Sequence, residues 1–187
     1  MAAVKVESCA LSGALPGPFC PRQSLSWFIP GVSPIARCEV HREVLVDRGS
    51  GRRLCRAREG AARAVHEFWP SDLRRLFARA GLPRREPPPY EPDCSPAMPS
   101  PGRPPAIGSP LEGVAYLVRP GAGERVALNA SADADAQRLS WFVDRELVGR
   151  SEPGRPLWWT ARPGRYTVRV VDERGRSDSR QLLVSLH

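Results

Sequence analysis

The C-terminal part of the chain alternates short apolar runs with turn-forming residues, which is the pattern of an all-β domain. Seven such runs lie between residues 107 and 187. They are Val114–Arg119, Arg125–Ala130, Leu139–Val143, Glu146–Gly149, Leu157–Thr160, Arg165–Val171 and Arg180–Leu186. Asp144-Arg145 and Glu173-Arg174-Gly175 indicate tight turns between strands. This spacing predicts an immunoglobulin-like antiparallel β-sandwich of about seven strands.

Two aromatic residues support the predicted sandwich. Trp141 lies in the third apolar run, where such folds often hold a core tryptophan. Tyr166 shares one strand face with Val168 and Val170. A tyrosine near the start of the penultimate strand is typical of the tyrosine corner, in which the phenol hydroxyl binds the backbone a few residues upstream.

A β-hairpin is predicted over residues 38–55. Its first strand alternates apolar and polar side chains, with Val44 and Val46 on one face. A turn over residues 48–51 leads into the returning strand. Prolines and glycines predict an irregular course before the hairpin, over residues 1–37.

A helix is predicted over residues 71–81, with Ser71 as its N-cap and Gly81 at its end. Its apolar stripe comprises Leu73, Leu76, Phe77 and Ala80. Its basic face comprises Arg74, Arg75 and Arg79. Arg74 and Arg75 are candidate interaction residues, although a solvated helix face is the more common role of such arginines.

The segment over residues 83–106 is rich in proline, which favours an extended, semi-rigid linker. The chain is therefore expected to divide into an irregular α+β segment over residues 1–82, this linker, and the sandwich over residues 107–187. The fold class predicted for the whole chain is mainly β.

The chain is basic, with a formal net charge of +8 from 28 basic and 20 acidic residues. A basic surface attracts polyanions, which makes a small polyanion-binding protein one interpretation. The basic residues are scattered along the chain, however, and no aromatic-interleaved RNA-binding signature occurs. We therefore expect no nucleic-acid partner.

No catalytic centre is predicted. Lys5 is the only lysine, and it has no serine three positions before it, so the Ser-x-x-Lys and Lys-Thr-Gly chemistry of serine–lysine acyl transferases is missing. Asp133 and Asp135 lack the glycine and glutamate of a calcium loop. We expect no cofactor and no metal site.

The five cysteines all lie in the first half of the chain, and none forms a Cys-x-x-Cys pair. A zinc ribbon or a thioredoxin-like motif is therefore not expected. In an oxidising compartment, Cys9 with Cys20 and Cys38 with Cys55 are the candidate disulfides, since the predicted hairpin brings the second pair together. Free buried thiols remain the alternative.

Trp158 and Trp159 are adjacent in one predicted strand, so they point to opposite faces of the sheet. One is expected in the core and the other at the surface. An exposed tryptophan on a sheet is a stacking platform for sugars or an anchor for a protein partner. Both residues are therefore candidate interaction residues.

No apolar run approaches the roughly 18–20 residues that span a bilayer. The first residues contain Lys5 and Glu7 without a sustained apolar run, which is a poor match to a secretion signal. We expect neither a signal peptide nor an anchor in this chain.

Two groups of motifs carry a family resemblance. The first comprises Trp27-Phe-Ile-Pro-Gly-Val-Ser-Pro-Ile, Cys38-Glu-Val-His-Arg and Trp69-Pro-Ser-Asp-Leu. The second comprises Ser109-Pro-Leu-Glu-Gly-Val, Ala132-Asp-Ala-Asp, Trp141-Phe-Val, Val148-Gly-Arg-Ser, Pro163-Gly-Arg-Tyr and Asp172-Glu-Arg-Gly-Arg-Ser. Together they resemble the segment after the transpeptidase domain in penicillin-binding proteins of the 1C type, which are bifunctional peptidoglycan glycosyltransferase/transpeptidases. The second group resembles that family's small C-terminal module.

The resemblance implies a periplasmic location, a parent protein anchored in the inner membrane, and a part in peptidoglycan synthesis. The catalytic motifs of the family have no counterpart here, so a non-catalytic accessory region is expected. Residues 1–82 would complete the transpeptidase region. The sandwich would bind peptidoglycan, a cell-wall protein partner or the upstream synthase domains. The alternative hypothesis is an independent small basic adaptor.

Overall fold

The computed structural model describes residues 2–94, 102–119, 121 and 123–187. The described residues form two compact units. The first unit comprises the residues up to Phe68 together with Arg85–Pro92. The second unit comprises Trp69–Arg84 and the residues from Asp93 onward.

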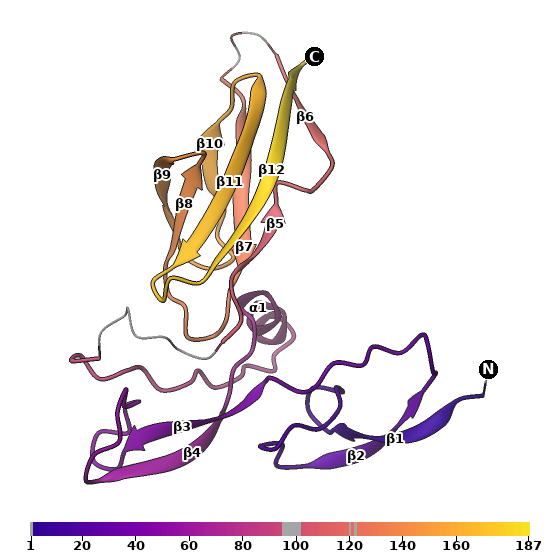
Figure 1. Cartoon of the computed structure of the whole chain (residues 1–187), viewed down its shortest axis with the longest axis vertical. Coiled ribbons are helices and arrows are strands. Elements are labelled where there is room, and N and C mark those ends of the chain that lie inside the picture. Colours follow the sequence, from indigo (N-terminus) through magenta and orange to yellow (C-terminus); the bar gives the residue numbers. More distant parts are fainter. Residues whose placement is uncertain (1, 95–101, 120, 122) are drawn as a thin grey trace. The chain divides into compact units, whose positions relative to one another are not determined.

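The second unit is a β-sandwich of a three-stranded and a five-stranded sheet (Figure 1). The three-stranded sheet has the order β10-β7-β5 and the five-stranded sheet the order β6-β12-β11-β8-β9. The strands are β5 Ala106–Ser109, β6 Ala115–Val118, β7 Arg125–Ser131, β8 Leu139–Val143, β9 Glu146–Ser151, β10 Leu157–Thr160, β11 Gly164–Asp172 and β12 Ser177–Leu186. All neighbours pair antiparallel except β6, which runs parallel to β12.

Strict alternation of buried and less buried positions builds the core of the sandwich. On β8, Leu139, Trp141 and Val143 are buried and the residues between them are less so, because successive side chains leave opposite faces of a strand. Trp141 is fully buried, and its indole Nε1 donates to the Ser151 Oγ at 2.9 Å. This bond satisfies the only polar atom of the indole, so the ring fills the core without an unpaired donor.

The mainly β fold with a C-terminal sandwich is confirmed, and each of the seven predicted runs is a strand. One strand, β5, was not predicted, because it falls at the end of the proline-rich segment. Its Ile107 is buried, and it pairs with β7. Pro105 and Pro110, which flank this strand, are also fully buried. This short segment is a strand because it pairs with β7, and a local sequence pattern does not encode such a pairing.

The predicted tyrosine corner is confirmed. Tyr166 donates its phenol hydroxyl to the Arg162 carbonyl oxygen at 3.0 Å. Its ring meets Trp159 edge to face, with ring centroids 4.9 Å apart. The corner therefore ties the loop before β11 to an aromatic pair that packs against the core.

Helix α1, Ser71–Arg79, is terminated by the predicted glycine, but its N-cap residue is Pro70 and not Ser71. Gly81 adopts a positive φ of 74°, and Leu82 N–H donates to the Phe77 carbonyl, which is the Schellman ending. Ser71 does not cap the helix. Its Oγ accepts from the Ala132 N–H at 3.1 Å, and its own N–H donates to the Ala132 carbonyl at 2.9 Å, so the residue binds the sandwich instead.

The apolar stripe of α1 is only partly covered. Leu73 and Leu76 are exposed, whereas Phe77 meets Trp69 edge to face at 4.9 Å between centroids. This helix was predicted within the N-terminal segment over residues 1–82. In the structure it belongs to the second unit, with the sandwich.

The first unit consists of two hairpins, and both differ from the prediction. They are formed by β1 Val4–Cys9 with β2 Gln23–Phe28, and by β3 His41–Asp47 with β4 Ala61–Glu67. The N-terminal hairpin lies where the prolines and glycines predicted an irregular course. Its strands are short and alternate apolar and polar residues, as in Val4-Lys5-Val6-Glu7 and Ser24-Leu25-Ser26-Trp27, and the prolines and glycines lie between and after them.

The hairpin predicted over residues 38–55 has the wrong returning strand. Its first strand is β3 as predicted, but the partner is β4, and residues 52–55 contribute only an isolated bridge between Arg53 and Val46. Glycines at positions 49 and 51 indicated a turn, and the chain does turn there. It then continues through a second loop before it returns.

The proline-rich segment is not a free linker throughout. Arg53 N–H donates to the Pro89 carbonyl at 2.8 Å, and Glu91 N–H donates to the Arg53 carbonyl at 2.9 Å. The Arg53 guanidinium also lies over the Tyr90 ring, 4.1 Å from its centroid. Residues 85–92 therefore belong to the first unit, and residues 95–101 of the predicted linker lie outside the described residues.

The first unit has a thin apolar core. Its buried apolar residues are Cys9, Cys38, Leu54 and Phe68, and two of these four are cysteines. The described part of the chain contains no helix with the length and apolar character needed to cross a membrane.

Candidate metal centre and interaction residues

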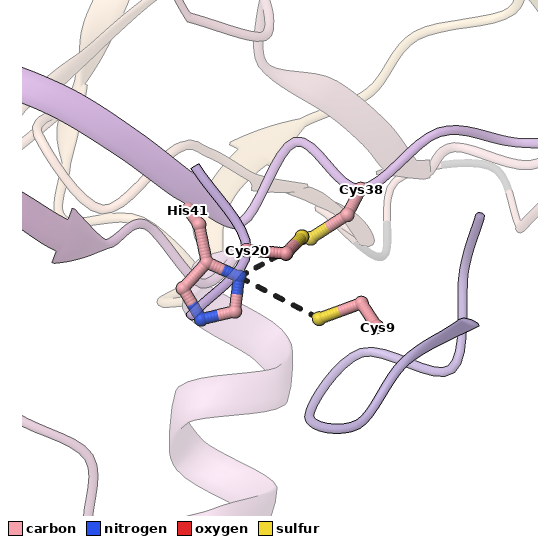
Figure 2. Close-up of side chains that lie close together, drawn as sticks. All are labelled: Cys9, Cys20, Cys38 and His41. Carbon is pink, nitrogen blue, oxygen red and sulfur yellow. Dashed lines mark hydrogen bonds between the residues drawn. The ribbon is translucent and has the colours of Figure 1, made fainter. Parts of the chain in front are cut away.

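Three cysteines and one histidine of the first unit gather at one point. They are Cys9, Cys20, Cys38 and His41, and the sulfur atoms and an imidazole nitrogen all lie within 4.8 Å of one another. The Nδ1 atom of His41 lies 3.6 Å from the Cys9 Sγ and 3.4 Å from the Cys38 Sγ. Figure 2 shows the sulfur atoms turned toward the imidazole ring. Cys9, Cys38 and His41 are buried, and Cys20 is half-buried.

Backbone hydrogen bonds bring Cys9 and Cys38 together. Cys9 is the last residue of β1, and its N–H donates to the Ala14 carbonyl at 2.8 Å, which folds the chain back on itself. Leu15 then pairs with Arg37, and the Cys38 N–H donates to the Leu15 carbonyl at 2.8 Å. The loop after β1 thus lies against the segment that leads into β3.

A tight turn places Cys20 at the same point. The Cys20 N–H donates to the Gly17 carbonyl at 3.2 Å, and the Gly17 N–H donates to the Cys20 Sγ at 3.2 Å. A Cβ atom on Gly17 would lie 2.8 Å from the Cys38 carbonyl oxygen, closer than such atoms approach. Only glycine therefore allows this turn to lie against Cys38.

The surroundings shift the thiol pKa values in opposite directions. Burial raises the pKa of Cys9, but hydrogen bonds from Ser12 and from the Leu11 N–H outweigh it and lower that pKa to about 6. Burial and the neighbouring Cys38 and Cys9 thiols raise the pKa of Cys20 to about 11, although the hydrogen bond from the Gly17 N–H acts to lower it. The cluster therefore contains one thiol that ionises readily and another that does not.

The cluster differs from the predicted disulfides. All five cysteines are free thiols in the structure, so neither candidate pair is bonded. Cys9 and Cys20 do lie close together, but Cys38 joins them instead of Cys55. The reason is the changed hairpin: the strand after β3 is β4, so Cys55 lies in the loop between these two strands.

No metal site was expected from the sequence, but three thiols and an imidazole are a donor set that could ligate a metal ion. The sequence has no Cys-x-x-Cys pair, but it contains Cys38-Glu-Val-His41. That Cys-x-x-His spacing was the available signal for two of the four residues.

Comparison with known families covers both units. Residues 97–183 match the family described as the Penicillin-Binding Protein C-terminus Family. Residues 3–43 match the family described as penicillin-binding protein 1A, C-terminal domain. The chain carries a penicillin-binding protein C-terminal module. The sequence resemblance is confirmed at this level.

No curated protein matches this chain. Among solved structures, the chain is similar to a structure titled "Structures of Clostridium thermocellum CbhA fibronectin(III)-like modules". The identity is 18%, the TM-score is 0.36, and the likeness covers 44% of this chain and 96% of that one.

The adjacent tryptophans of the penicillin-binding protein C-terminal module point to opposite faces, as the strand pattern predicts. Trp159 is half-buried and packs against the core of the sandwich. Trp158 is 55% exposed, and the Arg125 guanidinium lies over its ring at 5.8 Å from the centroid. Of the two candidates, Trp158 alone offers its ring to a ligand.

The two candidate arginines of α1, Arg74 and Arg75, belong to the second unit. Arg75 donates through its Nη1 to the Gly154 carbonyl oxygen, so its guanidinium holds the helix against the loop before β10. Burial lowers the pKa of the Arg74 guanidinium. This arrangement gives Arg75 an intramolecular role.

A buried charge network occupies the acidic turn of the module. Arg176 bonds to Asp172 Oδ2 and to Asp135 Oδ1, both at 2.7 Å, and it lies 3.8 Å from Asp133 Oδ2. Burial lowers the pKa of Arg176, but these carboxylates outweigh that effect and raise it. The two aspartates that were weighed as calcium ligands therefore bind an arginine.

Proposed function

We propose that this chain is a non-catalytic C-terminal part of a peptidoglycan synthase of the penicillin-binding protein 1C type. The family match over residues 97–183 carries this proposal. The second match, over residues 3–43, extends it into the first unit. The 1C type is supported by the motifs that begin at Trp27 and Cys38.

Within the synthase, the sandwich binds peptidoglycan through the face that carries Trp158. An exposed indole on a sheet is a stacking surface for a sugar ring. The Arg125 guanidinium beside it suits the carboxylates of the peptide stems. The periplasm is the compartment in which this contact takes place.

The first unit contacts the synthase's own upstream domains. Five of its exposed large apolar side chains lie close together in the sequence, and they are Leu25, Trp27, Ile29, Val32 and Ile35. Trp27 is 69% and Ile35 74% exposed, which is unusual for residues that meet only water. Side chains of this kind suit a protein interface.

Co-sedimentation of the full chain with purified peptidoglycan sacculi tests the sandwich's role. We expect binding by the natural chain, and a loss of at least about tenfold in affinity for Trp158→Ala, because hot-spot tryptophans contribute about 2 kcal/mol or more. Leu147→Ala removes another exposed apolar side chain from a different strand and serves as the control. Equal binding by the folded Trp158→Ala variant would contradict the proposal.

Three further measurements separate the alternatives. Incubation with a fluorescent penicillin should label no residue of this chain, and a specific covalent adduct would contradict the non-catalytic role. Binding to duplex DNA that survives physiological salt would favour the basic adaptor instead, since non-specific contacts weaken steeply with salt. An immunoblot of fractionated source cells should place the chain with the cell envelope.

A further inference from the structure

We propose that Cys9, Cys20, Cys38 and His41 bind one structural Zn²⁺ ion that holds the first unit together. This inference concerns the first unit alone and does not rest on the proposed function. It starts from the four ligand atoms, which converge within 4.8 Å from three separate segments of the chain.

The donor set is that of a closed structural zinc site. Three thiolates and one imidazole are a standard tetrahedral set for zinc, and no position remains open for a substrate. A disulfide would use two of the sulfur atoms and leave the third thiol and the imidazole without a role. Tetrahedral sites of sulfur and nitrogen ligands otherwise hold iron–sulfur clusters, which favour four thiolates.

The distances agree with this geometry. With Zn–S near 2.3 Å and Zn–N near 2.0 Å, two ligand atoms of a tetrahedron lie about 3.6 Å apart. The His41 Nδ1 lies 3.6 Å from the Cys9 Sγ and 3.4 Å from the Cys38 Sγ. Small shifts of the side chains, within the 4.8 Å spread of the cluster, would complete the tetrahedron.

The backbone around the cluster provides an outer shell. The Gly17 N–H donates to the Cys20 Sγ at 3.2 Å, and bonds of this kind orient and stabilise metal-bound thiolates. The close approach of Gly17 to the Cys38 carbonyl fixes the turn that presents this donor. The loop is therefore shaped around the sulfur atoms.

The first unit needs such a cross-link, because its own apolar core is small. Only Leu54 and Phe68 are buried apolar residues outside the cluster in the described part of this unit. Small units without a sufficient core are commonly stabilised by a metal or by disulfides. Metal binding then becomes part of the folding free energy.

The first test is the metal content of the full chain, purified under reducing conditions without a metal-affinity step and exposed to Zn²⁺. We expect about one zinc per chain by mass spectrometry. X-ray absorption should show about three sulfur atoms near 2.3 Å and one nitrogen near 2.0 Å. No zinc binding by the reduced chain, or a site without sulfur ligands, would overturn the proposal.

Variants identify the ligands. Cys20→Ser and His41→Ala should lose more than about 100-fold in zinc affinity, which exceeds the usual effect of an outer-shell change. His41→Cys should retain zinc, since four thiolates are also a structural zinc set. Cys55→Ser and Cys94→Ser are the matched controls, because neither cysteine belongs to the cluster, and both should bind zinc as the natural chain does.

The same variants distinguish a metal site from a disulfide. Thiol counting on zinc-free chain isolated from an oxidising compartment reports the redox state of the cysteines. A disulfide among Cys9, Cys20 and Cys38 in the natural chain, with no zinc bound, would overturn the proposal. Free thiols that become protected from alkylation when Zn²⁺ is added, in the natural chain and in Cys55→Ser alike, would support it.

Discussion

The Nδ1 atom of His41 lies 3.4 Å from the Sγ of Cys38, three residues earlier in the chain. The two residues stand at the entry to β3, where the loop after β1 reaches them with Cys9 and Cys20. Thiols and an imidazole thus make up much of the buried part of the first unit, whereas the sandwich has an apolar core.

Gly17→Ala should weaken zinc binding without removing a ligand. The new Cβ would lie 2.8 Å from the Cys38 carbonyl oxygen, which displaces the turn and its N–H donor to the Cys20 Sγ. We expect a loss of about 10- to 100-fold in zinc affinity, measured by competition with a chelator. Gly13→Ala, in the same loop with no atom near its Cβ, should cost stability but keep the affinity.

Arg176→Met should destabilise the sandwich strongly. The substitution removes the guanidinium that neutralises the buried carboxylates of Asp172 and Asp135. We expect a loss of about 3–5 kcal/mol in the free energy of unfolding, measured by urea titration with tryptophan fluorescence. Arg155→Met breaks an exposed pair with Glu152 and should change stability by about 0–1 kcal/mol. Similar losses for both variants would refute a buried network.

Tyr166→Phe should remove one hydrogen bond and little else. The phenol hydroxyl donates to the Arg162 carbonyl oxygen at 3.0 Å, while the ring contact with Trp159 is kept. We expect a loss of about 0.5–1.5 kcal/mol in the free energy of unfolding. Hydrogen exchange should rise in the loop before β11 but not in β8. An unchanged stability would show that the corner contributes nothing here.

Asp47 should titrate well below an ordinary aspartate. Its carboxylate accepts the Ser50 N–H at 2.8 Å and an Arg58 N–H at 3.0 Å, and these bonds lower its pKa from 3.8 to about 2. The stability that the ionised group contributes is present above its ordinary pKa and is lost as the pH falls through about 2. Carbon-detected NMR of the carboxyl group measures the midpoint, which Arg58→Met should raise. A midpoint near 4 in the natural chain would contradict the geometry.

Local sequence patterns are enough to predict the sandwich and several of its details. Period-two alternation and turn residues are local signals, so the strands from β6 to β12 follow from the order of the side chains. The tyrosine corner joins Tyr166 to a carbonyl only four residues upstream, so a local motif is enough to predict it. The termination of α1 by Gly81 is also predictable from a local signal, because glycine readily adopts the positive φ that ends a helix.

Contacts between residues far apart in the chain could not be predicted from such local patterns. The partner strand of β3 is β4, because the loop between the two strands is longer than its turn signal indicates. Cys55 therefore lies in this loop and outside the cluster that contains Cys38. Ser71 binds Ala132 instead of capping its helix, since the sandwich offers a backbone partner that no local pattern reveals. His41 meets Cys9 across 32 positions, and such convergence depends on the packing of three separate segments rather than on any spacing of residues.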